Sequence, residues 1–247
     1  MTDHLTYKLN IFKTTAALNK AAAEFIVLIA KQSIAERGRF CISLSGGQTP
    51  QKLYSCLSRS PFRAQLQWKN IFIFWSDERC VDLHDEKNNA HQAKLMLLDK
   101  IDIPQSNIYN IPVNLAPKKA ASNYEKKLKK FFGKKSPRFD LILLGLGENG
   151  HTASLFPGTK VIDEKAEGVR VVYVKEEKMF RITMTASLIN RARTILFLVT
   201  GKKKSAILKK VLTASYQPDK IPAQLIKPAD GNLYWFADAD AASLISV

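Results

Sequence analysis

Cysteine is scarce in this sequence: a chain of 247 residues contains only Cys41, Cys56 and Cys80, which lie far apart. No two of them form a C-x-x-C pair, and an odd number of cysteines cannot all be joined within one chain. This pattern excludes the usual zinc cage and argues against a framework of disulfides. We therefore expect reduced thiols, no metal site and a cytoplasmic location.

Long hydrophobic runs are also missing. The most apolar early segment, residues 21–30, contains Glu24 and is too short to cross a bilayer. The first residues, Met1-Thr2-Asp3-His4, do not have the pattern of a signal peptide. Neither an internal repeat nor a long Pro/Gly/Ser linker divides the chain. We expect a single domain over residues 1–247 with no membrane association.

Acidic residues are few relative to basic ones. The 38 Lys and Arg outnumber the 22 Asp and Glu, for a net charge of +16. Such an excess suits a nucleic acid, an anionic membrane or an anionic small molecule. Two lysine clusters stand out, Lys126, Lys127, Lys129, Lys130, Lys134, Lys135 and Lys202, Lys203, Lys204, Lys209, Lys210. We interpret the first as a solvated helix face, because no aromatic residues interleave it as in a single-strand binding platform.

Strand-like and helix-like segments alternate along the chain. Strands are predicted at residues 40–44, 71–75, 108–111, 141–144, 169–174, 195–199 and 233–236. Helices are predicted from Thr14 or Thr15 to Gly38, from about Pro50, and over residues 90–98, 120–132 and 202–212. This alternation favours an α/β fold whose mostly parallel sheet has helices on both faces.

The segment 141–158 is the most informative part of the sequence. Its apolar start predicts a buried strand, and Gly145, Gly147 and Gly150 then lead directly to His151. Ligands bind at the carboxyl ends of strands in open α/β sheets, and a histidine there can exchange protons near neutral pH. The glycines also match the dinucleotide pattern G-x-G-x-x-G. Nicotinamide binding is not expected, because the match lies past mid-chain and Pro157-Gly158 prevents a long helix from following.

Two other loops follow predicted strands. In the first, Ser45, Gly46, Gly47 and Thr49 precede a helix start, which suits a phosphate. It lacks the G-K-[ST] ending of a Walker loop, and taken alone it is also compatible with a simple turn and helix cap.

The second loop is Ser76-Asp77-Glu78-Arg79, where a guanidinium can grip hydroxyl or carboxylate oxygens. Arg181 and Lys204 are further candidate cations for a phosphate. Each of these charges, taken alone, is compatible with a surface position. The histidines His4, His84 and His91 lack a comparable context, and we interpret them as surface residues.

These segments, in this order, resemble the 6-phosphogluconolactonase family within the glucosamine-6-phosphate isomerase/deaminase superfamily. The resemblance rests on Ser45–Pro50, Phe74–Val81, Gly145–Gly158 and Arg181–Thr185, and it extends from the first predicted helix to the last strand. The Ser-Asp-Glu-Arg form is similar to the lactonase branch.

The resemblance implies a Rossmann-like α/β fold that hydrolyses 6-phospho-D-glucono-1,5-lactone to 6-phosphogluconate in the pentose phosphate pathway without a cofactor. It implies His151 as acid and base and Arg79 as the second catalytic residue. The substrate-binding residues would be Ser45, Gly46, Gly47, Thr49, Asp77, Asn149, Arg181 and Lys204. The expected partner is a small anionic sugar phosphate, bound by a monomer that engages neither nucleic acid nor membrane.

One position departs from the family pattern. Asn149 stands where the superfamily commonly has aspartate, and an amide can hydrogen-bond to His151 but cannot hold a proton. Three other functions therefore remain open: a sugar-phosphate isomerase or deaminase of the same fold, a non-catalytic sugar-phosphate sensor, and a nucleic-acid-binding protein suggested by the charge.

Overall fold

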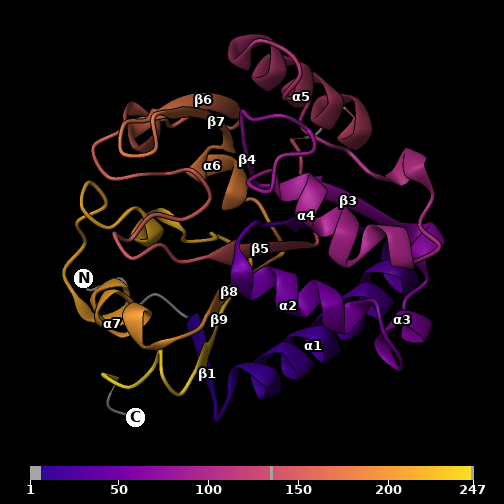
Figure 1. Ribbon diagram of the computed structural model, residues 1–247, viewed down its shortest axis with the longest axis horizontal. Coiled ribbons are helices and arrows are strands. Elements are labelled where there is room, and N and C mark those ends of the chain that lie inside the picture. The colour runs from indigo at the N-terminus through magenta and orange to yellow at the C-terminus, as the bar shows by residue number, and fades with distance from the viewer. Residues whose placement is uncertain (1–6, 134–135, 246–247) are drawn as a thin grey trace.

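A parallel sheet of six strands forms the centre of the computed structural model, which describes residues 7–133 and 136–245 (Figure 1). The strand order is β1-β9-β8-β5-β2-β3, and every pairing is parallel. The bounds are β1 Tyr7–Phe12, β2 Phe40–Leu44, β3 Ile71–Trp75, β5 Leu141–Gly145, β8 Thr194–Val199 and β9 Asn232–Asp238. Since β2, β5 and β8 are almost entirely buried, their apolar runs are those of strands covered on both faces.

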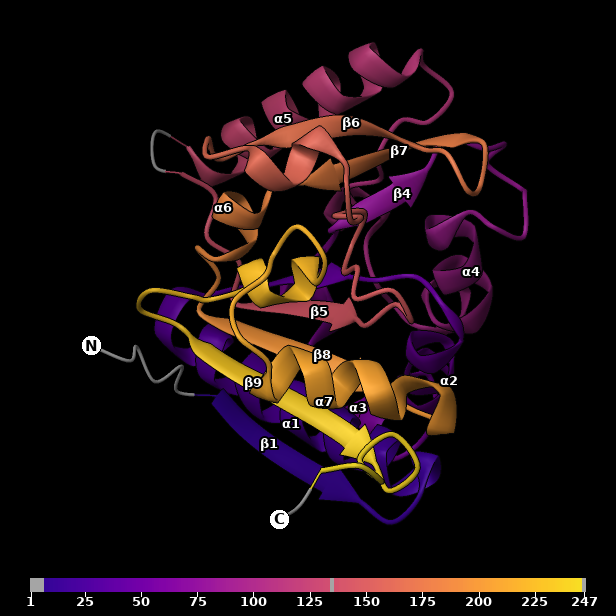
Figure 2. The same cartoon turned by 90° about the vertical axis from the view of Figure 1, so that its left-hand side faces the viewer.

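Helices cover both faces of this sheet, as predicted. Figure 2 shows α7 in front of β8 and β9, with α1 behind the sheet. The α-helices are α1 Thr15–Arg37, α2 Gln48–Leu57, α3 Phe62–Gln65, α4 Asn89–Met96, α5 Pro117–Phe132, α6 Ala186–Ile189 and α7 Ser205–Thr213. Short 3₁₀ turns lie at Trp68–Asn70, Leu98–Lys100, Gln105–Asn107, Lys160–Asp163, Lys202–Lys204 and Pro222–Leu225. No helix within the described ranges is long and apolar enough to cross a membrane.

The predicted ends of α1 are confirmed. The Thr14 side chain accepts a hydrogen bond from the Ala17 N–H, and Gly38 ends the helix at a φ of 71°. Both are ordinary helix signals, because the cap satisfies a free N–H and glycine adopts the left-handed conformation without strain.

A second sheet was not predicted. It has three antiparallel strands in the order β4-β7-β6, with bounds β4 Asp77–Arg79, β6 Val169–Val174 and β7 Met179–Met184. Helix α5 packs along β6 and β7. The predicted loop at residues 76–79 is therefore partly a strand, in which Arg79 pairs with Arg181. A short charged segment shows no strand periodicity, and its partner lies about a hundred residues away in sequence.

Three further differences concern single elements around the larger sheet. Strand β1 was not predicted, and the predicted helix at 202–212 is a 3₁₀ turn followed by α7. The strand predicted at 108–111 is wrong, because only a single bridge joins Ile108 to Ile73. The Tyr109 N–H donates to the Ile73 carbonyl at 2.9 Å, and asparagine side chains make the neighbouring contacts. The Asn107 amide donates to the Ile71 carbonyl, and Asn110 accepts from the Trp75 indole.

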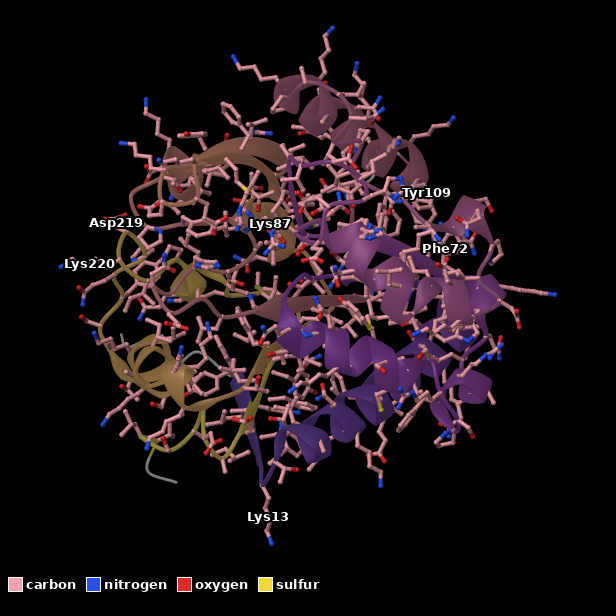
Figure 3. The ribbon with its side chains drawn as sticks, in the orientation of Figure 1. Lys13, Phe72, Lys87, Tyr109, Asp219 and Lys220 are labelled. Carbon is pink, nitrogen blue, oxygen red and sulfur yellow. The ribbon has the colours of Figure 1, made fainter. Side chains whose placement is uncertain are left out.

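The basic surface lies mainly outside the sheets. Lys126, Lys127, Lys129 and Lys130 are exposed on α5, which confirms the solvated helix face, and Lys134 and Lys135 lie outside the described residues. Figure 3 shows side chains of α5 extending into solvent, as does Lys13 at the opposite end of the molecule. His84 is exposed as predicted, His91 is half-buried against it, and His4 lies outside the described residues.

The central strand allows a test of the packing. Leu143 is fully buried in β5, and we expect Leu143→Ala to lower the free energy of unfolding by about 2–5 kcal/mol, through lost burial and the cavity that remains. Leu28→Ala is the matched control, because Leu28 is 51% exposed on α1, and its effect should stay within about 0.5 kcal/mol. Urea unfolding measures both, and equal losses would contradict the central place of β5 in the core.

Candidate active site

Loops from both sheets surround one pocket of about 660 Å³, a size suited to a small metabolite. It lies at the carboxyl ends of β2, β5 and β8, which a parallel sheet places along the same edge. All ten site residues named from the sequence line it: Ser45, Gly46, Gly47, Thr49, Asp77, Arg79, Asn149, His151, Arg181 and Lys204. The structure therefore brings together five segments that are far apart in the chain.

Two glycines determine how His151 enters the pocket. Gly150 has a φ of 82°, which glycine adopts readily, and an added Cβ would lie 3.1 Å from the Ile221 Cα. A Cβ on Gly147 would lie 2.1 Å from His151 Nδ1, so only glycine leaves room for the ring. The imidazole then stacks on Phe156, with ring centroids 4.0 Å apart.

Asn149 determines the tautomer of His151. Its Oδ1 lies 2.6 Å from His151 Nδ1 and also accepts a hydrogen bond from the His151 backbone N–H at 3.2 Å. Because that backbone group can only donate, the atom facing Nδ1 is the amide oxygen. Nδ1 therefore carries the proton, and Nε2 keeps its lone pair.

The surroundings keep the imidazole neutral. Burial, together with the positive charges of Arg181 and Lys204, lowers the pKa of His151 to about 4, although Glu177 opposes this shift. A smaller effect in the same direction comes from Arg79. A histidine with this pKa is unprotonated at neutral pH and is available as a base.

Arg181 is held between two carboxylates. Its Nη1 lies 3.7 Å from Asp77 Oδ2, and its Nη2 forms an ion pair with Glu177. Ser154 donates a hydrogen bond of 2.7 Å to the same Asp77 oxygen, and the guanidinium lies 5.1 Å from the centre of the Phe156 ring. Arg181 thus stands beside His151 with acceptors at both of its Nη groups.

Glu78 organises the loop that carries Arg79. Its buried carboxylate accepts hydrogen bonds from the backbone N–H groups of Arg79, Asn89 and Ala90, the last two at the start of α4. Burial nevertheless raises the pKa of Glu78 to about 7. The Arg79 Nη1 donates to the Lys87 carbonyl at 2.7 Å, and Figure 3 places Lys87 near α4. Arg79 Nε is buried and has no partner within the described part of the chain.

The glycine turn after β2 is shaped by a close neighbour. A Cβ on Gly46 would lie 1.8 Å from Asn89 Oδ1, so the two segments meet only because residue 46 is glycine. Gly47 has a φ of 103° and directly precedes α2, whose first residues line the pocket. The first N–H groups of a helix have no partner within the helix. On the same side, the hydroxyls of Thr49 and Thr200 lie 2.7 Å apart.

Several lining residues were not named from the sequence. They include Gln48, Lys52, Asn89, Glu176, Glu177 and Thr200. Lys52 follows the glycine turn on α2, so its spacing was a usable signal. Asn89 and Glu177 reach the pocket from α4 and from the turn between β6 and β7, and nothing local in their sequence indicates this. No group of three His, Cys, Asp or Glu side chains suited to a metal occurs among the residues that the structure describes.

Comparison with known proteins identifies the family. A family model described as glucosamine-6-phosphate isomerases/6-phosphogluconolactonase matches residues 13–235. A 6-phosphogluconolactonase of Synechocystis is 42% identical over 215 residues, covering 85% of this chain and 86% of that protein. One of Haemophilus influenzae is 35% identical over 229 residues, covering 93% and 95%. The solved structure of a 6-phosphogluconolactonase from Trypanosoma cruzi matches with a TM-score of 0.88 at 28% identity and covers 98% of both chains. The chain therefore belongs to the family of glucosamine-6-phosphate isomerases and 6-phosphogluconolactonases.

Proposed function

We propose that this protein is a 6-phosphogluconolactonase, an enzyme that hydrolyses 6-phospho-D-glucono-1,5-lactone to 6-phospho-D-gluconate in the oxidative pentose phosphate pathway. The observation that carries the proposal is a neutral histidine with a free Nε2 in a pocket rich in cations. The names of the relatives in two organisms and of the matching solved structure support the same activity.

The chemistry asks for a base and later an acid at one place. His151 Nε2 takes a proton from water as the water oxygen bonds to the lactone carbonyl carbon. The tetrahedral intermediate then loses its ring C–O bond, and His151 returns the proton to that ring oxygen. The imidazole ends neutral, as it began, and one water has been added. Acid–base help of this kind contributes about 10²–10⁴-fold.

The negative charge that develops on the carbonyl oxygen needs a donor. Arg79 carries an Nε–H that lacks a partner in the described residues and lines the same pocket as His151. A preorganised donor in a site poor in water stabilises an oxyanion more than it would in solution. We assign this role to Arg79.

The phosphate is assigned to the glycine turn at the start of α2. There the first turn of α2, with Gly46, Gly47 and Thr49, offers N–H and hydroxyl donors beside Ser45. Lys204 and Lys52 supply the charge. Arg181 is a weaker candidate than the sequence suggested, because Asp77 and Glu177 already engage its guanidinium. Asp77 acts through Arg181 in this assignment.

We propose a monomeric, cytoplasmic protein of a single domain, since the family model spans residues 13–235 without interruption. We propose that it engages no nucleic acid, because an anionic substrate in the pocket already accounts for part of the positive charge.

Deaminase activity is less compatible with the site, since Asn149 cannot hold a proton beside His151. Ammonia release from glucosamine 6-phosphate would reverse that choice.

His151→Ala tests the base directly. We expect kcat to fall by about 10²-fold or more with an unchanged fold, because the acid–base group is lost. A lactonase assay corrected for spontaneous hydrolysis measures it, and His84→Ala, which changes an exposed histidine outside the pocket lining, is the control. Near wild-type kcat in His151→Ala would exclude this residue as the base.

Substrate phosphorylation should matter strongly. We expect unphosphorylated gluconolactone to have a kcat/KM lower by about 10²-fold or more, because the binding energy of the phosphate positions the lactone for attack. Lys204→Met should lower kcat/KM for the phosphorylated lactone only, and Lys209→Met, which alters an exposed lysine of α7, should change neither. Similar efficiencies with both substrates would remove the phosphate site.

Asn149→Asp should move the pH profile. A carboxylate 2.6 Å from Nδ1 favours the imidazolium, so the pKa of His151 should rise from about 4. Because a base with a higher pKa is protonated over more of the acidic range, the acidic limb of kcat/KM should shift to higher pH. Activity near pH 8 should stay within about tenfold, since the base itself is unchanged.

NMR titration of the His151 ring reports the pKa independently of turnover. Asn123→Asp, which adds the same charge on the exposed face of α5, is the control. An acidic limb that stays in place in Asn149→Asp would mean that residue 149 does not sense the charge on the histidine.

A further inference from the structure

Arg181 presents an unusual combination of burial and engagement. Its side chain is 6% exposed and meets Asp77 from one side and Glu177 from the other. Glu177 lies in the turn between β6 and β7, and its side chain is 37% exposed. Its carboxylate could therefore be solvated by water without pairing with Arg181. The Arg181 Nε has no partner in the described part of the chain. Nη1 thus faces Asp77 and Nη2 is paired with Glu177, while the Nε–H is unpaired.

The occupied groups lie near the reacting end of the pocket. His151 and Arg181 both contact Phe156, at 4.0 Å between ring centroids and 5.1 Å from the guanidinium carbon to the ring centre. The positive charge of Arg181 is also close enough to help lower the pKa of His151. In the proposed reaction, water attacks the lactone carbonyl carbon beside His151. The carboxylate that results therefore lies close to Arg181.

Hydrolysis changes the charge at this place. The lactone carbonyl is neutral, whereas the product carries a carboxylate there in addition to its phosphate. An arginine with both Nη groups free would bind that carboxylate through two parallel hydrogen bonds, which are among the strongest in proteins. Such an arginine would contribute far more binding free energy to the product than to the substrate, and product release would be slow.

We propose that Glu177 is a positioning residue that favours product release: its carboxylate occupies the Arg181 guanidinium and so keeps it from holding the carboxylate that hydrolysis creates. The inference rests on the proposed function. Asp77 Oδ2 lies 3.7 Å from Nη1 and leaves Nη2 free. Glu177 is therefore the residue that pairs with Nη2.

Glu177→Gln tests the proposal by a gain of binding. We expect 6-phosphogluconate to bind this variant about tenfold more tightly, which corresponds to about 1.4 kcal/mol. Isothermal titration calorimetry measures the affinity, and the product-inhibition constant should fall by the same factor. D-glucitol 6-phosphate has the phosphate but no carboxylate, so its affinity should change less than about twofold. A merely structural role for Glu177 would weaken product binding instead.

Glu176→Gln is the matched control, because Glu176 is adjacent, lines the same pocket and forms no ion pair among the described residues. It removes the same charge and should leave both affinities nearly unchanged. Equal tightening for the two ligands, equal effects of the two variants, or product binding at or below the wild-type level would each overturn the proposal.

Two further results separate possible failures. If wild-type protein does not bind 6-phosphogluconate at all, the proposed function is wrong and the inference loses its basis. If Glu177→Gln does not fold, Glu177→Asp provides the same test, because its shorter side chain withdraws the carboxylate from Nη2 while keeping the charge, and product binding should again tighten.

Discussion

Parallel pairing of β2, β5 and β8 is the constraint on which the site depends. Because the carboxyl ends of parallel strands lie along the same edge of a sheet, the loops that follow them converge even when they are far apart in the sequence. Here those loops carry the glycine turn before α2, the histidine turn after β5 and the Thr200–Lys204 segment. Close packing then imposes glycine at two positions. Gly46 admits Asn89, and Gly147 admits the imidazole of His151. The pocket is therefore a consequence of strand direction and of missing Cβ atoms.

Electrostatics give this pocket its chemical character. Burial and nearby cations lower the pKa of His151, which favours the neutral base at physiological pH. Asn149 orients the ring through Nδ1 without adding a negative charge. A carboxylate at this position would orient the ring equally well, but it would also stabilise the imidazolium. The departure from the family pattern thus affects the protonation range of the base more than its placement, and it is compatible with the proposed hydrolysis.

The small antiparallel sheet contributes charge to a site built mainly by the larger one. It brings Asp77 and Arg79 from β4 next to Arg181 from β7, and its connecting turn carries Glu177. The result is a cation that is largely neutralised by two carboxylates beside the reacting centre. The pocket must attract a phosphate and then release a product of greater negative charge. Cations that differ in how far carboxylates neutralise them suit both tasks. Lys204 and Lys52 line the pocket and are the cations that we assign to the substrate, whereas Arg181 is paired with carboxylates.

The sequence by itself determined the elements and the chemistry that depend on local signals. Apolar runs predicted β2, β3 and β6 at their observed bounds, and Thr14 and Gly38 predicted the ends of α1. The glycine turns and His151 indicated the pocket, and all ten named residues line it. Only the tertiary structure decided the second sheet, the absence of a strand at 108–111, and the contacts of Arg181, Asn89 and Glu177. The physical reason is that these features depend on partners distant in sequence. Strand pairing, ion pairing and close backbone approach are properties of two segments together, and neither segment encodes them alone.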